Sequence, residues 1–193
     1  VCCNHLQLKI VDKEVKNPKD TSRSFLKWAD YLRDKNEIQE WVLDGFLTPF
    51  QVDVLEKTGH WRSTHLWHPT GAGKTLSAIL WSLCREGSIL VLTRAASRIQ
   101  YGREFERFTK LRPYVVRPAN QRKKKNSLSL QNYLDWCSKK KQRPIVVVGW
   151  ESLTSVFTEI ENFEPNILIY DESHKGKNTK RYEAIPLPDY HGD

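Results

Sequence analysis

Short apolar runs recur along the chain from about residue 64 onward, and each run is bounded by turn residues. The runs are nearly continuous and rich in β-branched residues, which is typical of strands that are buried on both faces of a sheet. They are THLWH (64–68), SILVLT (88–93), PYVVR (113–117), PIVVVG (144–149) and NILIY (166–170).

Helical apolar spacing occupies stretches between these runs. GKTLSAILWSLCRE (73–86) and SRIQYGREFERF (97–108) each place apolar side chains three and four residues apart, on one helical face. The apolar positions are Leu76, Ile79, Leu80 and Leu83 in the first stretch and Tyr101, Phe105 and Phe108 in the second. Strands that alternate with helices predict an α/β fold, with a mostly parallel sheet and helices on both faces.

Residues 1–47 follow a different pattern, and we interpret them as an accessory N-terminal segment before a domain at 48–193. LQLKIV (6–11) is compatible with a strand. SRSFLKWADYLRD (22–34) and NEIQEWVLDGF (36–46) have helical apolar spacing.

The composition is that of one soluble globular domain with an appendage: 193 residues, 39% hydrophobic and 28% charged. A net charge of +8 favours a polyanionic partner. The sequence contains no uninterrupted run of 18 apolar residues, so we expect no membrane span.

The four cysteines show no metal-ligand spacing, which favours a reduced, intracellular protein. Because the chain contains no Met, we expect it to be a fragment.

The stretch PTGAGKT (69–75) joins the first apolar run to the helical stretch that follows it. Glycines let successive backbone N–H groups point at a phosphate, and the N-terminus of the next helix adds its positive end. Lys74 would reach the β and γ phosphates, and the Thr75 hydroxyl would join the Mg²⁺ shell. The strict pattern requires glycine where this chain has His68. The alternative is a strand-to-helix turn that needs glycine only for its shape.

A pair of carboxylates, Asp171 and Glu172, ends the last apolar run. In a parallel sheet the ligand crevice lies at the carboxyl ends of the strands. There Asp171 could hold Mg²⁺ through water, and Glu172 could orient and deprotonate the attacking water. The alternative is an ordinary acidic helix N-terminus after a strand. The glycine loop earlier in the chain favours the site.

Together, PTGAGKT and DESH (171–174) resemble motifs I and II of superfamily 2 helicases and translocases, the DExH/DEAH-like group. DESHKGKN (171–178) is similar to the Snf2-type segment, and WHPTGAGKT (67–75) is similar to motif I of restriction-type and large-virus helicases. The resemblance covers about residues 48–180. It implies the first of two RecA-like P-loop domains, which binds ATP with Mg²⁺ and moves on nucleic acid, with DNA favoured over RNA as the partner but RNA still open.

The resemblance also implies roles for single residues. Lys74 and Glu172 would be catalytic, Thr75 and Asp171 would serve the metal, and His174 would couple the nucleotide state to the second domain. The nucleotide would contact Gln51, Pro69, Thr70, Gly71, Ala72, Gly73, Lys74 and Thr75.

Gln51 has two interpretations that do not exclude each other. GFLTPFQ (45–51) resembles the region in which a glutamine reads the adenine edge. Thr48 and Gln51 also form a capping-box pattern, with Pro49 at the favoured first helical position.

Further residues resemble nucleic-acid contacts of the family. Arg94 and Ser97 lie in the segment similar to motif Ia, where a cation and a hydroxyl would meet phosphates; the alternative is a capped surface helix. Trp150 could stack on a base, although a Trp is more often core. The lysine runs at 121–126 and 139–143 are either solvated loops or part of a nucleic-acid path.

Two other functions stay open at this point. One is a viral packaging-type P-loop ATPase, and the other is a nucleic-acid-binding module with a structural nucleotide site and no enzymatic activity. We expect a second RecA-like domain to be missing from this chain, and the isolated fragment to be weakly active or inactive.

Overall fold

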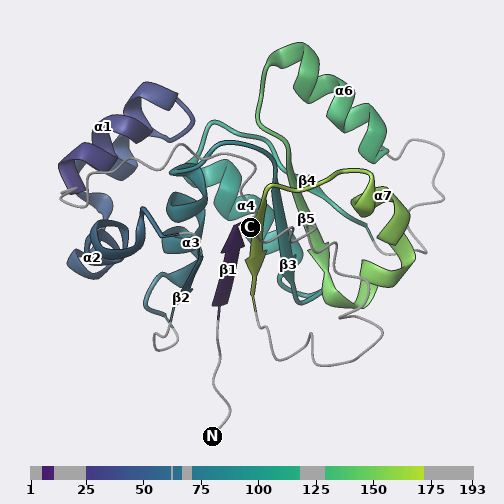
Figure 1. Cartoon of the computed structure of the whole chain (residues 1–193), viewed down its shortest axis with the longest axis horizontal. Coiled ribbons are helices and arrows are strands. Elements are labelled where there is room, and N and C mark those ends of the chain that lie inside the picture. Colours follow the sequence, from purple (N-terminus) through teal and green to yellow (C-terminus); the bar gives the residue numbers. More distant parts are fainter. Residues whose placement is uncertain (1–5, 11–24, 62, 67–70, 118–128, 172–193) are drawn as a thin grey trace, which may run out of the picture.

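A six-stranded sheet in the order β2-β1-β6-β3-β5-β4 forms the centre of the molecule (Figure 1). The computed structural model describes residues 6–10, 25–61, 63–66, 71–117 and 129–171. The strands are β1 (Leu6–Ile10), β2 (Ser63–Leu66), β3 (Ile89–Thr93), β4 (Tyr114–Val115), β5 (Ile145–Gly149) and β6 (Ile167–Tyr170). All five apolar runs of the sequence therefore form strands.

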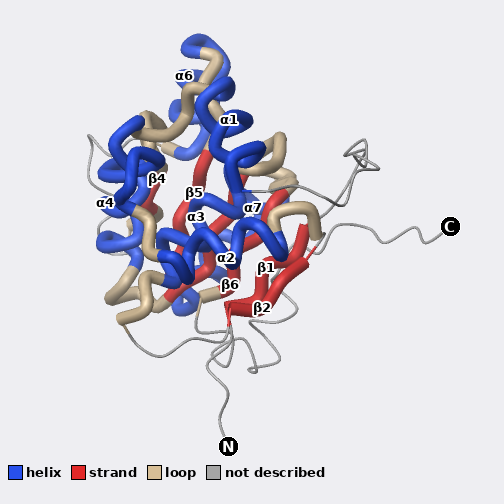
Figure 2. The backbone as a smooth tube through the Cα atoms, turned by 90° about the vertical axis from the view of Figure 1, so that its left-hand side faces the viewer, coloured by secondary structure: helices blue, strands red, loops and turns tan. Residues whose placement is uncertain are grey.

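Four of these strands, β4, β5, β3 and β6, are parallel neighbours. β1 is antiparallel to both β2 and β6, so β2 runs in the same direction as β6. Figure 2 shows β1 and β2 side by side at one border of the sheet and β4 at the other. The mostly parallel sheet predicted from the sequence is confirmed.

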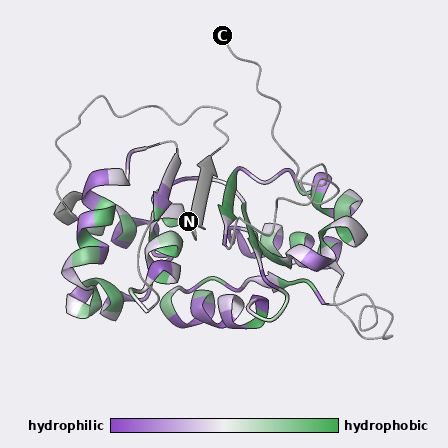
Figure 3. Cartoon of the chain, turned by 90° about the horizontal axis from the view of Figure 1, so that it is seen from below, coloured by the Kyte–Doolittle hydropathy of each residue, from purple (hydrophilic) through white to green (hydrophobic). Residues whose placement is uncertain are grey.

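Helices cover both faces of the sheet, and successive side chains of a strand point alternately to the two helical layers. On β3, Ile89 and Val91 belong to one hydrophobic cluster, whereas Leu90 and Leu92 belong to the other. Since successive side chains of a strand point to opposite faces, both faces are buried. The sheet therefore lies between helical layers, and Figure 3 shows strongly hydrophobic residues on these strands.

The helical elements divide between the two faces. On the first face lie α1 (Phe25–Lys35), α2 (Pro49–Thr58), α3 (Lys74–Leu83) and α4 (Arg98–Phe108), with the short turn η1 (Val42–Phe46). On the second face lie α6 (Leu130–Lys140), η2 (Trp150–Val156) and α7 (Phe157–Glu161).

α3 is more deeply buried than its pattern predicted. Every residue from Leu76 to Leu83 is buried, not only one face. The outer side is covered as well: the Trp81 indole donates to the Thr58 carbonyl at 2.8 Å, and the Arg85 guanidinium lies 3.3 Å from the centroid of the Trp81 ring. The four predicted apolar positions are buried as expected, and the other residues of this stretch are buried too because the layer of α1 and α2 covers α3 from outside.

The helix predicted over residues 36–46 is not formed as one piece. Asn36 follows α1 with a φ of +53°, and Ile38 makes an isolated antiparallel bridge to Thr109. Within Val42–Phe46, Gly45 has a φ of +98°. Left-handed backbone at Asn36 and Gly45 interrupts the α-helical hydrogen-bond pattern that apolar spacing alone suggests.

The segment before residue 48 shares the sheet and the core with the rest of the chain. β1 pairs with β2 and β6, and Trp28, Ala29 and Leu32 of α1 belong to the same cluster as α3. The division at residue 47 stays a prediction about domain organisation, but physically the described residues on both sides of it pack together.

Candidate nucleotide-binding site

The glycine loop leads directly into α3. Gly71 and Gly73 have φ values of +86° and +75°, and α3 begins at Lys74 with Gly73 as its N-cap. A side chain at Gly73 would bring its Cβ within 2.4 Å of Gln51 Nε2. The left-handed backbone therefore favours glycine at position 73, and a Cβ there would also displace the Gln51 amide. His68, Pro69 and Thr70 lie outside the described residues.

Gln51 joins α2 to this loop. Its Oε1 accepts a hydrogen bond from the Thr48 N–H at 2.9 Å, while its own N–H donates to Thr48 Oγ1 at 3.3 Å, so the capping box is present. The remaining amide group is also used, because Nε2 donates to the Gly73 carbonyl at 3.3 Å. The side chain is buried, with 5% of its residue surface exposed. Gln51 thus anchors the glycine loop to the first turn of α2, and its contact with adenine stays a prediction.

Asp171 follows β6 and is held by its neighbours in the sheet. Its N–H donates to the Leu92 carbonyl at 2.8 Å, and its Oδ2 accepts from Thr93 Oγ1 at 2.6 Å. Thr93 is a site residue that the sequence analysis missed. The available signal was its position as the last residue of a buried strand, where a hydroxyl can reach the end of a parallel neighbour. Glu172 and His174 lie outside the described residues.

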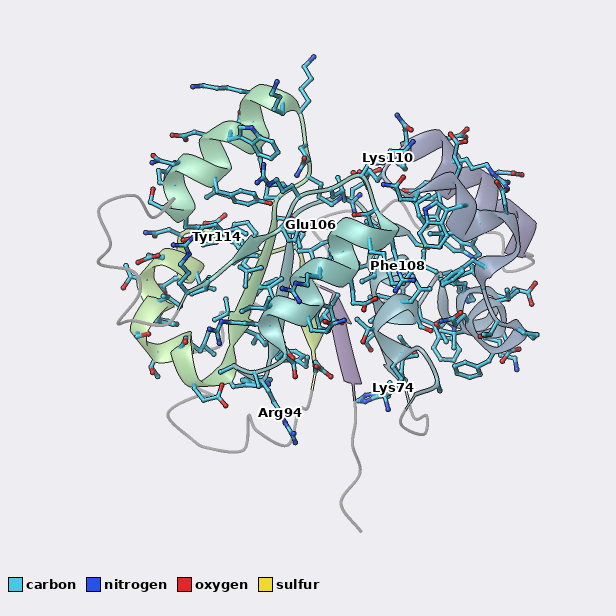
Figure 4. The ribbon with its side chains drawn as sticks, turned by 180° about the vertical axis from the view of Figure 1, so that it is seen from behind. Lys74, Arg94, Glu106, Phe108, Lys110 and Tyr114 are labelled. Carbon is cyan, nitrogen blue, oxygen red and sulfur yellow. The ribbon has the colours of Figure 1, made fainter. Side chains whose placement is uncertain are left out.

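Lys74, Asp171 and Arg94 all follow strands that point the same way, so they lie at the carboxyl edge of the sheet. Figure 4 shows Lys74 and Arg94 at this common edge. A cation, a helix N-terminus and a carboxylate at one edge are suited to a phosphate bound with a divalent cation. The half-buried hydroxyl residue Thr75 lies in the first turn of α3.

The oxygen groups of Thr75 and Asp171 fit Mg²⁺, which prefers oxygen ligands and keeps several waters. Among the described residues, no group of three or more His, Cys, Asp or Glu could hold a metal ion by itself. Mg²⁺ at this edge would therefore take most of its ligands from phosphate oxygens and water.

Trp150 lies in the core, which corrects its interpretation as a base-stacking residue. Only 1% of its surface is exposed, and its ring stacks on Tyr170 with centroids 5.9 Å apart. Its indole N–H donates to the Asp171 carbonyl at 2.8 Å. In this position the ring supports the strand end that carries Asp171 and presents no face to a nucleic-acid base.

The motif Ia-like segment contacts the end of β5 and the first turn of η2. Arg94 is exposed, and half-buried Ser97 stands at the N-cap of α4 without a side-chain capping bond. Glu151 Oε2 accepts from the Ala95 N–H at 2.9 Å. A Cβ on Gly149 would approach the Ala95 Cα to 2.9 Å, so these two segments pack closely. Glu151 is a further residue that the sequence analysis did not single out.

Tyr101 of α4 is fully buried near this edge. Burial, and secondarily the negative charge of Asp171, hold the pKa of its phenol well above its ordinary value. Among the described residues its hydroxyl has no hydrogen-bond partner. The phenol therefore stays neutral.

The parallel sheet, the glycine loop at the start of α3 and the strand-end carboxylate define a RecA-like P-loop domain of the helicase-like superfamily 2 type. Residues 34–190 match the family model ResIII, described as type III restriction enzyme, res subunit. The chain belongs to this family, whose domain is a helicase-like ATP-binding motor domain.

The comparison with curated proteins finds no match to the chain. In the part of the chain that the structure describes, no helix is long and apolar enough to cross a membrane.

Proposed function

We propose that this domain binds and hydrolyses ATP with Mg²⁺ and couples hydrolysis to movement on nucleic acid, DNA in preference to RNA. The observation that supports the proposal most strongly is the common carboxyl edge of the sheet. There the glycine loop, with its left-handed residues Gly71 and Gly73, leads into α3, and Asp171 accepts a hydrogen bond from Thr93. Family membership supports the ATP-binding part of this proposal.

In this proposal the backbone N–H groups of residues 70–73, after Pro69, and the Lys74 ammonium bind the phosphates. Thr75 and Asp171 serve the Mg²⁺ ion, directly or through water. Glu172 takes the proton of the attacking water. Phosphoryl transfer requires positioning and charge stabilisation more than covalent chemistry, so rigid support of the loop by Gln51 and of Asp171 by Thr93 and Trp150 favours this function.

Calorimetric titration with Mg·ATP tests the proposal. Lys74→Ala removes a charge-assisted contact worth about 1.5–3 kcal/mol, so we expect affinity to fall about 10- to 150-fold. The control is Lys57→Ala, which removes the same charge from an exposed position of α2, where Lys57 pairs with Asp53 at 2.8 Å. Equal affinity in wild type and Lys74→Ala would refute binding through the loop.

Contacts with the nucleic-acid backbone are proposed at Arg94 and Ser97, which lie at the carboxyl edge. An exposed cation and a hydroxyl at a helix start suit phosphate oxygens. Fluorescence anisotropy titrations with labelled single- and double-stranded DNA and RNA compare the affinities of the domain for these nucleic acids. Arg94→Gln should weaken binding to all sequences alike, because phosphate contacts carry no direct sequence information.

A further inference from the structure

A groove of about 680 Å³ runs along β4, between α4 and α6, on the border of the sheet away from β2. Figure 4 labels Tyr114 on β4 and Glu106 on α4, two of the residues that line the groove. Since β4 is the last strand in the sheet order, no further strand of the described chain pairs with its outer side. Its lining includes three aromatic residues and three arginines: Tyr114, Tyr133, Trp136, Arg98, Arg112 and Arg117.

The aromatic residues form a stack of three rings. Tyr133 stands in the middle, with its ring centroid 5.5 Å from Tyr114 at 29° and 6.1 Å from Trp136 at 25°. Its hydroxyl donates to the Arg112 carbonyl at 2.8 Å and accepts from the Ile145 N–H at 3.0 Å, which fixes the ring. Tyr133 is buried, whereas Tyr114 and Trp136 are half-buried at the groove. The groove thus offers the aromatic rings of Tyr114 and Trp136, which stack on the fixed ring of Tyr133, to a planar ligand.

The charge of this surface is strongly positive. Glu106 is the single acidic residue in the described lining, against the three arginines. Trp136 also borders a second cavity, of about 360 Å³, between the ends of α1 and α6. That cavity is lined by four lysines and one carboxylate, namely Lys35, Lys110, Lys140, Lys141 and Glu37. The basic surface therefore continues past Trp136 toward the amino edge of the sheet.

We propose that the groove along β4, continued past Trp136, binds a segment of single-stranded nucleic acid, with phosphates on its arginines and lysines and bases against Tyr114 and Trp136. This inference rests on the proposed nucleic-acid function and adds a second contact surface, which begins beside the carboxyl edge at Arg98 and extends along β4. Aromatic stacking with basic side chains is how single strands are bound without sequence preference.

Single-stranded nucleic acid fits this lining better than other anionic polymers. A duplex keeps its bases stacked on each other, so they are not available to the rings of the groove. An extended peptide could pair with the outer edge of β4, but its acidic side chains carry no aromatic ring to stack on Tyr114 and Trp136, whereas every nucleotide carries a base. The arginine fork matches phosphate oxygens in a bidentate way.

Fluorescence anisotropy of a labelled oligothymidine across a salt series, with the 193-residue chain, tests the charge component. Arg112→Gln and Arg117→Gln should each reduce the magnitude of the logarithmic salt slope by about 0.7, the value for one phosphate on a single strand. Lys57→Gln, which loses the same charge on α2 at the other side of the molecule, should leave the slope unchanged.

The stacking component is tested with a matched pair at Trp136. Trp136→Leu keeps an apolar side chain but removes the ring, and we expect affinity to fall about 5- to 150-fold. Trp136→Phe keeps a ring and should retain most of the affinity. Thermal melting of each variant separates a loss of binding from a loss of folding.

Several results would overturn the inference. One is an unchanged slope in both arginine variants beside a reduced slope in Arg94→Gln; this would leave the proposed function intact and confine binding to the carboxyl edge. Equal affinities of Trp136→Leu and Trp136→Phe, or competition by poly-glutamate as strong as by unlabelled oligothymidine, would exclude base stacking. No binding of any nucleic acid by the wild type would refute the inference and the proposed partner together.

Discussion

Replacing Gln51 tests how the glycine loop is held. Gln51→Ala removes the acceptor for the Thr48 N–H and the donor to the Gly73 carbonyl. At about 0.5–1.5 kcal/mol for each hydrogen bond, we expect a loss of about 2 kcal/mol of stability. For a chain of this length, this corresponds to a fall in Tm of roughly 4–8 °C. Differential scanning calorimetry measures this change.

Thr48→Val provides the matched control. It removes the other half of the capping box, the Oγ1 acceptor of the Gln51 N–H, and leaves the bond from Gln51 to Gly73. It should cost about 0.5–2 kcal/mol of stability, as other N-cap replacements do. Because the loop keeps its anchor, affinity for Mg·ATP should change much less than in Gln51→Ala.

Two ligands, one with and one without adenine, distinguish the two proposed roles of Gln51. If the side chain anchors the loop, Gln51→Ala should weaken binding of Mg·ATP and of Mg·triphosphate, which has no base, by the same factor. If it reads adenine, only the affinity for ATP should fall. Unchanged affinity for both ligands in Gln51→Ala would refute the reasoning that the bond to the Gly73 carbonyl holds the loop for phosphate binding.

Three further predictions follow from the same structure and sequence. Glu172→Gln should keep nucleotide binding but stop ATP hydrolysis in a longer protein that contains the second domain, because Gln cannot take a proton; unchanged turnover would favour a different base. Replacing the lysines at 123–125 by Glu should flatten the salt slope of DNA binding in anisotropy titrations, and an unchanged slope would assign this run to solvated loop. Burial raises the pKa of the Cys84 thiol to about 12, so iodoacetamide at pH 8 should leave Cys84 unmodified in the folded protein, as peptide mass spectrometry would show; rapid modification would contradict its burial.

The sequence predicted the parts of the fold that depend on local pattern. Continuous apolar runs become β3, β5 and β6, because a strand between two helical layers has no polar face. The loop at Gly71–Thr75 was recognisable because Gly73, Lys74 and Thr75 keep the last three positions of the phosphate-loop pattern, although His68 replaces its first glycine. The pairing of β1 between β2 and β6 could not be predicted, since a short apolar run does not encode its distant neighbours.

The hydrogen-bond partners of the site residues could not be predicted from the sequence either. The bond between Thr93 and Asp171 joins residues 78 positions apart, and it depends on the order of strands in the sheet. Trp150 was ambiguous because the pattern after β5 does not reveal whether the ring turns inward. In the structure the Trp150 ring turns inward, and its indole N–H donates to the Asp171 carbonyl.

A crystal structure of the chain with Mg²⁺ and a non-hydrolysable ATP analogue tests the central claim most directly. We expect the β and γ phosphates against the N–H groups of Gly71–Thr75, with Lys74 Nζ in contact and the metal ion beside Thr75 and Asp171. Density for the nucleotide elsewhere, for example along β4 against Tyr114 and Trp136, with the glycine loop making no contact to phosphate, would contradict it.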